Sequence, residues 1–209
     1  MVYKNLFYRL LFSVFFFAIF FISFENKFSL FILGTCIYLL ILFEIVKFFK
    51  KFFKKILFYL FLSYLCFVLY FFILFDHLIF NVFVFTIIFF DTFSYVSGKL
   101  FGKNNIFKYI SPKKTLEGYL GGILFTNVFL IVFFYFIEIK FTFTTFIILY
   151  NAIIFFSIGG DLIESYFKRK NNIKDSSKYL PGHGGYFDRF DSFISSIVML
   201  TLFSLIINL

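Results

Sequence analysis

The sequence predicts an all-α integral membrane protein, a polytopic helical bundle of about seven transmembrane helices joined by cytoplasmic loops. Of its 209 residues 62% are hydrophobic, and the mean hydropathy of +0.97 is far above that of soluble domains. The apolar residues form long runs separated by short polar breaks, and these breaks carry most of the basic residues. An ordinary soluble domain is therefore excluded.

The apolar runs give the spans. A membrane-crossing helix needs roughly 20 apolar residues, and this length predicts helices over residues 6–24, 28–46, 56–75, 78–96, 119–137, 145–163 and 191–208. The residues before Glu25 lack the small-x-small pattern that signal-peptide cleavage requires, so we expect the first run to remain as a helix.

The polar breaks predict the orientation of the spans. Every Lys and Arg except Lys27 and Lys140 lies near the N-terminus or in the alternate breaks 47–55, 97–118 and 164–190. The positive-inside rule places the N-terminus and these three breaks in the cytoplasm. The first break reads KFFKKFFKK; it either sets orientation alone or also attracts anionic lipid, at about 1 kcal/mol per basic residue.

The two cysteines, Cys36 and Cys66, each lie inside an apolar run, where a thiol behaves as a small hydrophobe. They predict neither a disulfide framework nor a zinc site. No repeat or linker divides the chain, so we expect a single membrane-embedded domain over residues 1–209.

Four aspartates lie in or beside the spans near the predicted cytoplasmic face. Asp91 lies in TIIFFDTFSYVSG and Asp161 in FFSIGGDLIES, while Asp188 and Asp191 open the last span. An ionisable residue at membrane depth is costly and is therefore a functional candidate. Unrelated acids at the membrane surface are the alternative, but that would leave them unpaired in apolar surroundings.

Helical spacing brings some of these acids together. Residues three apart, such as Asp188 and Asp191, are neighbours on one helix face. Asp161 shares a stripe with Lys168 and with Glu164 or Ser165. Adjacent carboxylates repel unless a proton or cation lies between them. Oxygen ligands without clustered thiols or imidazoles favour a hard cation, Mg²⁺ above all.

Mg²⁺ held by few carboxylates completes its shell with water and substrate phosphates, which indicates a phosphate-bearing substrate. Lys and Arg are the usual phosphate partners. The loops supply Lys113, Lys114 and the Thr115 hydroxyl in SPKKTLEG, and Lys168, Arg169, Lys174, Lys178 and Arg189 near the last loop.

The segment PGHGG, residues 181–185, has two interpretations. Its glycines can adopt backbone angles that let main-chain N–H groups face an anion, or they can form an ordinary Pro-Gly turn. His183 is either a loop residue or a group that transfers a proton or hydrogen-bonds to phosphate.

Together these residues resemble the phosphatidate cytidylyltransferase family, also called CDP-diacylglycerol synthases. The family signature runs from a Ser-x-hydrophobic-Lys-Arg block through Lys-Asp and Pro-x-His-Gly-Gly to Asp-Arg-x-Asp. Residues 165–191, SYFKRKNNIKDSSKYLPGHGGYFDRFD, match every defining position. The segments DTFSYVSGKLFGK and SPKKTLEG also resemble family blocks, so the similarity covers roughly the last 120 residues.

The resemblance implies an enzyme of phospholipid biosynthesis that transfers CMP from CTP to phosphatidate with Mg²⁺, giving CDP-diacylglycerol and pyrophosphate. It implies that residues 1–80 are N-terminal membrane helices and residues 81–209 the catalytic region. It further implies metal binding by Asp161, Asp188 and Asp191, with Asp91 as a further ligand or an orienting group, and room for a second cation.

The remaining roles also follow from the resemblance. Basic side chains hold the triphosphate and the departing pyrophosphate, and the glycines let the backbone approach the nucleotide. The residues concerned are Lys113, Lys114, Thr115, Lys168, Arg169, Lys174, His183, Gly184, Gly185 and Arg189, with Ser111, Thr115 and Glu117 shaping their loop. The partners implied are CTP, phosphatidate, membrane lipid and a second copy in a homodimer, without nucleic acid, in the plasma membrane.

Two alternatives stay open from the residues. Another Mg²⁺-dependent membrane lipid phosphotransferase, such as a CDP-alcohol phosphotransferase, would usually carry an Asp-Gly-x-x-Ala-Arg motif, which is absent from this sequence. A cation channel or carrier would use intramembrane acids along a route across the bilayer, whereas these acids cluster near one face.

Overall fold

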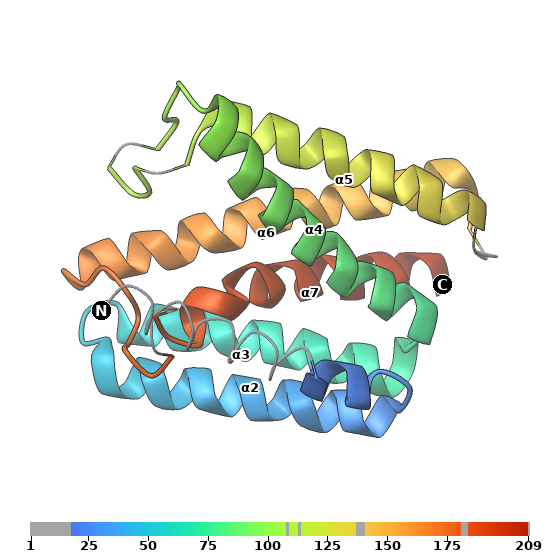
Figure 1. Cartoon of the computed structure of the whole chain (residues 1–209). Helices are drawn as coiled ribbons and strands as arrows, with labels where there is room; N and C mark the ends of the chain where they lie inside the picture. Colours follow the sequence, from blue (N-terminus) through green and yellow to red (C-terminus); the bar gives the residue numbers. More distant parts are fainter. Residues whose placement is uncertain (1–17, 108, 113, 137–140, 181–183, 209) are drawn as a thin grey trace.

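The computed structural model describes residues 18–107, 109–112, 114–136, 141–180 and 184–208 (Figure 1). Its long helices are α2 (Lys27–Phe48), α3 (Phe53–Leu69), α4 (His77–Phe101), α5 (Leu116–Phe136), α6 (Phe143–Lys170) and α7 (Phe187–Asn208), and a π-helical turn, η1 (Tyr70–Leu74), continues α3. All the named elements of these residues are helices, which confirms the all-α prediction.

Among the described residues, six helices are long and apolar enough to cross a membrane, and they coincide with six of the predicted spans. The first predicted span, 6–24, lies mostly outside the described residues. Within its described part, residues 18–23 are helical. Several helices extend beyond their apolar runs: α4 continues to Phe101, α6 continues to Lys170 and α7 begins at Phe187. A helix does not end where its apolar run ends, so these extensions carry polar residues beyond the spans.

Three helix N-termini at one end of the bundle carry side-chain caps. Asn26 Oδ1 accepts from Phe28 N at 2.9 Å, and Asp76 Oδ1 accepts from Leu78 N at 3.0 Å. The Thr142 hydroxyl accepts from the third helical N–H of α6 at 3.3 Å. Each cap satisfies an N–H group that has no partner within its own helix.

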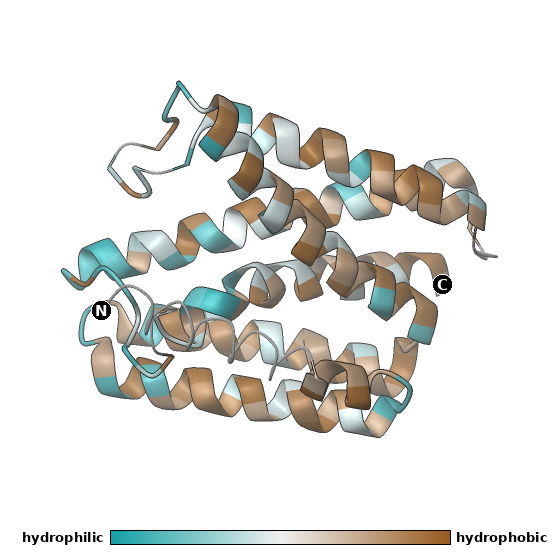
Figure 2. Cartoon of the chain, viewed as in Figure 1, coloured by the Kyte–Doolittle hydropathy of each residue, from teal (hydrophilic) through white to brown (hydrophobic). Residues whose placement is uncertain are grey.

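Helix α7 lies in the middle of the bundle, between α6 and α3 (Figure 1). Ile194 and Ile197 of α7 are fully buried, as are Ile153 of α6 and Ile56 of α3. Outer faces remain apolar, for example at Leu120 on α5, where lipid tails would cover them. Figure 2 shows the apolar colouring along the helices and hydrophilic residues at the end of α6 and the start of α7.

Small residues bring α4 and α5 close together. A Cβ added at Gly118 would lie 2.9 Å from the Ser94 carbonyl oxygen and 3.1 Å from Gly98 Cα. Such contacts are typical of membrane helix pairs, in which small residues permit close backbone approach. This packing fixes the two ends of the loop 102–115.

Polar side chains link helices inside the spans. The Tyr38 hydroxyl donates to Ser63 Oγ at 2.5 Å, and Ser63 Oγ donates to the Ile194 carbonyl at 2.5 Å, which connects α2, α3 and α7. Asn127 of α5 and Asn151 of α6 exchange amide hydrogen bonds of 2.9 and 2.8 Å. These bonds satisfy polar groups that lipid cannot satisfy.

Candidate active site at the loop end of the bundle

The three longest basic breaks of the sequence lie at one end of the bundle, at the left in Figure 1. They are the α2–α3 turn (49–52), the α4–α5 loop (102–115) and the α6–α7 loop (171–186). We call this end the loop end.

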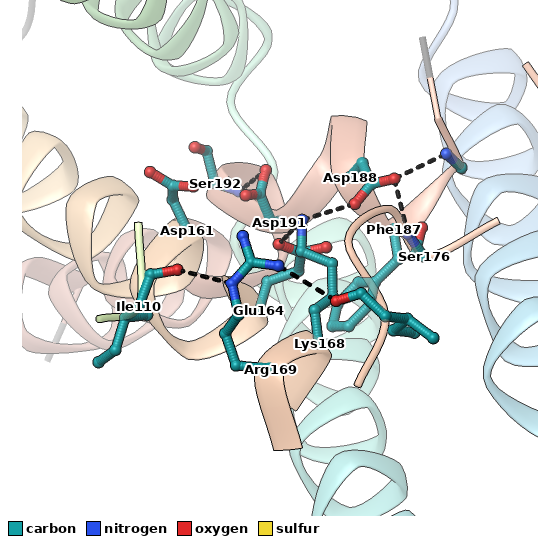
Figure 3. Close-up of polar contacts among 12 residues, drawn as sticks. Ile110, Asp161, Glu164, Lys168, Arg169, Ser176, Phe187, Asp188, Asp191 and Ser192 are labelled. Atoms are coloured by element: carbon teal, nitrogen blue, oxygen red, sulfur yellow. Dashed lines mark hydrogen bonds and ion pairs between the residues drawn. The ribbon is translucent and has the colours of Figure 1, made fainter. Parts of the chain in front are cut away.

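Three carboxylates from two helices meet at the loop end and form what we call the acid cluster. Asp161 and Glu164 of α6 and Asp191 of α7 each offer an oxygen within 4.8 Å of the others (Figure 3). The approach of the two helices depends on Gly160, where an added Cβ would lie 2.5 Å from the Asp191 carbonyl oxygen. The structure thus brings together the predicted Asp161 and Asp191.

Glu164 is the member of the acid cluster that the sequence predictions did not include as a ligand. It is 1% exposed, and its Oε1 is buried without a hydrogen-bond partner among the described residues. Its position three residues after Asp161 was the available signal, since this spacing places both on one helix face. A buried, unpartnered carboxylate oxygen is costly unless a cation or proton faces it.

Asp188 lies beside the acid cluster with both oxygens engaged (Figure 3). Oδ1 accepts from Lys168 Nζ at 2.7 Å, and Oδ2 accepts from Ser176 N at 2.9 Å and from Gly185 N at 2.8 Å. Asp188 therefore binds the α6–α7 loop to the start of α7, and its role as a metal ligand stays a prediction.

Lys168 lies between two acids. Its Nζ is 2.6 Å from Glu164 Oε2 and 2.7 Å from Asp188 Oδ1, and its side chain is mostly buried. Removing one partner of such a buried ion pair destabilises the folded protein, because the remaining charge is left uncompensated. Lys168 thus neutralises carboxylates in this structure, and the predicted phosphate contact stays a prediction.

Lys114, from the α4–α5 loop, contacts the Asp161 carboxylate and lies 5.9 Å from the centroid of the Tyr119 ring. Burial lowers the pKa of Lys114, but the facing Asp161 carboxylate, together with Tyr119 and Asp91, raises this pKa above its ordinary value. The ammonium group therefore stays charged at neutral pH. Its neighbour Lys113 lies outside the described residues.

Asp91 of α4 has an accessible side chain near the same group of charges. Its carboxylate interacts electrostatically with Lys114, Asp161 and Arg189. Helix α4 thus contributes the remaining predicted acid to the loop end, and Arg189 extends from the first turn of α7 with its side chain exposed.

Two side chains that were predicted to contact phosphate, those of Arg169 and Thr115, form hydrogen bonds that hold the α4–α5 loop in place. Arg169 Nε donates to the Ile110 carbonyl at 3.2 Å, and the Thr115 hydroxyl accepts from Gly118 N at 3.2 Å, at the start of α5. Glu117 accepts from the backbone N–H of Lys103 at 3.0 Å, which confirms that it shapes this loop. Phosphate contacts of Arg169 and Thr115 stay predictions.

The glycines of the α6–α7 loop pack against carboxylates. Gly184 has φ +83°, a left-handed conformation that favours glycine, and an added Cβ would lie 2.4 Å from Asp188 Oδ2. Leu180 N donates to the Gly184 carbonyl at 2.9 Å and closes the turn. Lys174 is exposed in this loop, and His183 lies outside the described residues.

Glu44 of α2 is a buried acid that the predictions missed. It is 0% exposed, and its Oε2 accepts from Tyr186 N at 2.8 Å and from Phe187 N at 3.4 Å. The signal was present, because Glu44 interrupts the apolar run LLILFEIV and an ionisable residue within a span is a functional candidate.

The α2–α3 turn is bonded to the end of α6 by Asn171. Asn171 Oδ1 accepts from Lys50 N at 3.0 Å and from Lys51 N at 2.7 Å, and its Nδ2 donates to the Lys51 carbonyl at 3.1 Å. The basic turn therefore has a defined position beside α6.

Among the described residues, the acid cluster and Asp188 supply four carboxylates, and Lys114 and Lys168 are paired with them. Lys114 pairs with Asp161, and Lys168 is shared by Glu164 and Asp188, while the acid cluster adds a further carboxylate. Carboxylate oxygens gathered in this way suit a divalent cation.

The sequence matches a protein family over most of its length and individual known proteins over about half of it. A sequence model described as the cytidylyltransferase family matches residues 2–207. Phosphatidate cytidylyltransferase of Staphylococcus haemolyticus (strain JCSC1435) is 39% identical over 112 residues, which are 54% of this chain and 43% of the relative.

The protein of the same name from Staphylococcus aureus (strain COL) is 41% identical over 114 residues, again 54% of this chain and 43% of the relative. The matched segment thus spans less than half the length of these curated relatives. Because the family match extends over nearly the whole chain, this protein belongs to the cytidylyltransferase family.

Proposed function

We propose that this protein transfers CMP from CTP to phosphatidate, releasing pyrophosphate and forming CDP-diacylglycerol. The observation that carries the proposal is the acid cluster of Asp161, Glu164 and Asp191, beside Lys114 and Lys168 at the loop end of a membrane bundle. The names of the relatives support the choice of substrates.

The acid cluster fits Mg²⁺, because its donors are all carboxylate oxygens and Glu164 Oε1 is buried without a hydrogen-bond partner among the described residues. Asp161, Glu164 and Asp191 would hold the ion, with Asp188 and Asp91 as further ligands or orienting groups. Bound there, Mg²⁺ would neutralise and orient phosphate oxygens. A second cation is part of the same proposal.

The side chains of this chain would bring two polyanions together. The phosphate of phosphatidate is largely ionised near neutral pH and attacks the α-phosphorus of CTP without needing a strong base. A P–O bond forms between them as the bond from the α-phosphorus to the β-phosphate oxygen breaks, and pyrophosphate leaves with that oxygen and its negative charge.

The basic residues would stabilise the charge on the transferring and leaving groups. Lys114, Lys174 and Arg189 would bind the triphosphate, together with Lys113, Lys168 and Arg169. The Thr115 hydroxyl and His183 would hydrogen-bond to phosphate. Gly184 and Gly185, which pack closely against carboxylates, would also let the backbone approach the nucleotide.

We further propose that the loop end faces the cytoplasm of the cell and that the protein resides in the plasma membrane. The basic loops support this orientation. CTP would then enter from water, and phosphatidate from the adjacent leaflet. We also propose a homodimer, and cross-linking in native membranes tests this arrangement.

The cation-carrier alternative is weaker. The carboxylates of the acid cluster lie at one end of α6 and α7, whereas a carrier requires polar groups along a route through the bilayer.

The test is direct incubation of purified protein with phosphatidate, Mg²⁺ and CTP labelled at the α-phosphate. We expect a labelled liponucleotide and unlabelled pyrophosphate. The proposal would be refuted if no product formed across several lipid compositions, provided that a cooperative thermal-unfolding transition shows the protein to be folded. Ion flux from liposomes without nucleotide chemistry would favour the carrier.

A further inference from the structure

We propose that Glu44 of α2 is a positioning residue that fixes the first turn of α7 and thereby places Asp188 and Asp191. The proposal rests on the function proposed above. It assigns a role in the site to a helix that contributes no member of the acid cluster.

Glu44 caps α7 from another helix. Its Oε2 accepts from the N–H groups of Tyr186 and Phe187, at the point where α7 begins. The first N–H groups of a helix have no partner within it, and negative charge near them is favourable. Residue 186 is Tyr, which has no short side-chain oxygen for the usual local cap.

The other oxygen of Glu44 lies against the glycine turn. A Cβ added at Gly185 would lie 1.9 Å from Glu44 Oε1 and 2.2 Å from Ser176 Oγ. Glycine at this position therefore allows the α6–α7 loop to lie directly on a carboxylate buried inside the bundle.

Glu44 and Asp188 bind the same turn from two sides. Asp188 Oδ2 accepts from Gly185 N and Ser176 N, whereas Glu44 accepts from the next two N–H groups along the chain. Asp191 follows Asp188 by three residues and belongs to the acid cluster. Release of Glu44 would loosen this turn, and both aspartates would lose their fixed positions.

The experiment compares Glu44→Gln and Glu44→Ala with Glu25→Gln, which changes an exposed acid in the turn that precedes α2. Amide hydrogen exchange of the purified full-length protein is followed in peptides covering 176–190, together with kcat and KM for CTP. We expect faster exchange at residues 185–188 in both Glu44 variants. We also expect kcat to fall at least about tenfold in Glu44→Ala, and less in Glu44→Gln, which keeps one acceptor oxygen.

A change confined to kcat and to this segment would distinguish positioning from general instability. Unchanged hydrogen exchange in Glu44→Gln, or exchange raised equally in all helices, would overturn the proposal. If Glu44→Ala does not fold, the exchange measured in Glu44→Gln alone tests the proposal. If the wild-type protein transfers no CMP, the proposed function is wrong. The exchange data then still test whether Glu44 fixes the first turn of α7.

Discussion

The backbone of Asp191 occupies the space that a side chain at Gly160 would need, whereas nothing lies within 4 Å of a Cβ added at the adjacent Gly159. The two glycines therefore form a matched pair on α6. Gly160 sets the distance between α6 and α7 at the level of the acid cluster, and Gly159 does not.

Gly160→Ala is expected to separate α6 from α7 and to lower kcat at least about tenfold, with roughly 1–3 kcal/mol of destabilisation from overpacking. Gly159→Ala should retain activity, since alanine also favours a helix. Turnover and thermal unfolding in detergent measure both effects. Equal activity of the two variants would show that the site does not depend on this contact.

The acid cluster predicts which carboxylates govern metal affinity. Glu164→Gln and Asp191→Asn should each weaken Mn²⁺ binding, measured by electron paramagnetic resonance, at least about tenfold. Glu25→Gln is the control for loss of one negative charge. Wild-type affinity in Glu164→Gln would remove Glu164 from the site.

Asp188→Asn should abolish turnover while leaving membrane insertion intact. Its contacts with Ser176 N and Gly185 N add a second expectation, namely faster proteolysis of the α6–α7 loop. Cleavage rates with and without Mg²⁺ check this. An active variant with a protected loop would contradict both expectations.

Lys114 is expected to act through a charge that does not titrate in the working range. Its raised pKa keeps the ammonium group protonated, and this charge would be lost only as the pH rises through that raised value. Lys114→Gln should lower kcat/KM about 100-fold, as expected for loss of a charge-stabilising donor. The wild-type pH–rate profile should show no break from Lys114 between about pH 6 and 9.

The exposed Lys99, in the last turn of α4, supplies the control for Lys114. Lys99→Gln should leave kcat/KM within about twofold of wild type, since surface charges contribute little. Equal losses in both variants would indicate a general effect of charge.

The amide pair of Asn127 and Asn151 predicts a coupling inside the membrane. Either single change to Leu leaves the other amide without its interhelical partner and should destabilise the protein by about 1–2 kcal/mol. The double Leu variant should lose less than the two single losses combined. Unfolding of all three variants in detergent measures the coupling, and strict additivity would contradict it.

The sequence predicted the helices well because apolar length alone selects a spanning helix. It also singled out Asp161 and Asp191, which the structure brings together, since carboxylates near a membrane face are conspicuous; their role as ligands stays a prediction. It did not assign Glu164 to the ligands, because a stripe on α6 does not show which of its members faces α7. The contact at Gly160 decides that, and no local pattern records it.

Glu44 is visible in the sequence as an acid within an apolar run, but its contacts could not be predicted. Its partners are the backbone N–H groups of Tyr186 and Phe187, which lie far away in the sequence and have no side-chain signature. Lys168 and Arg169 show the reverse case. Their charges predicted phosphate binding, whereas their contacts in the structure are with carboxylates and with backbone carbonyls.

The attachment of the α2–α3 turn to Asn171 restricts how this protein can be recombined with its relatives. The turn at Lys50 and Lys51 is recognised through main-chain atoms, so its side chains can vary while residue 171 keeps an amide. A chimera that exchanges only α2, α3 and the turn between them should therefore assemble as long as the donor turn has the same backbone shape. One whose donor turn is longer or shorter should fail unless the end of α6 is exchanged with it.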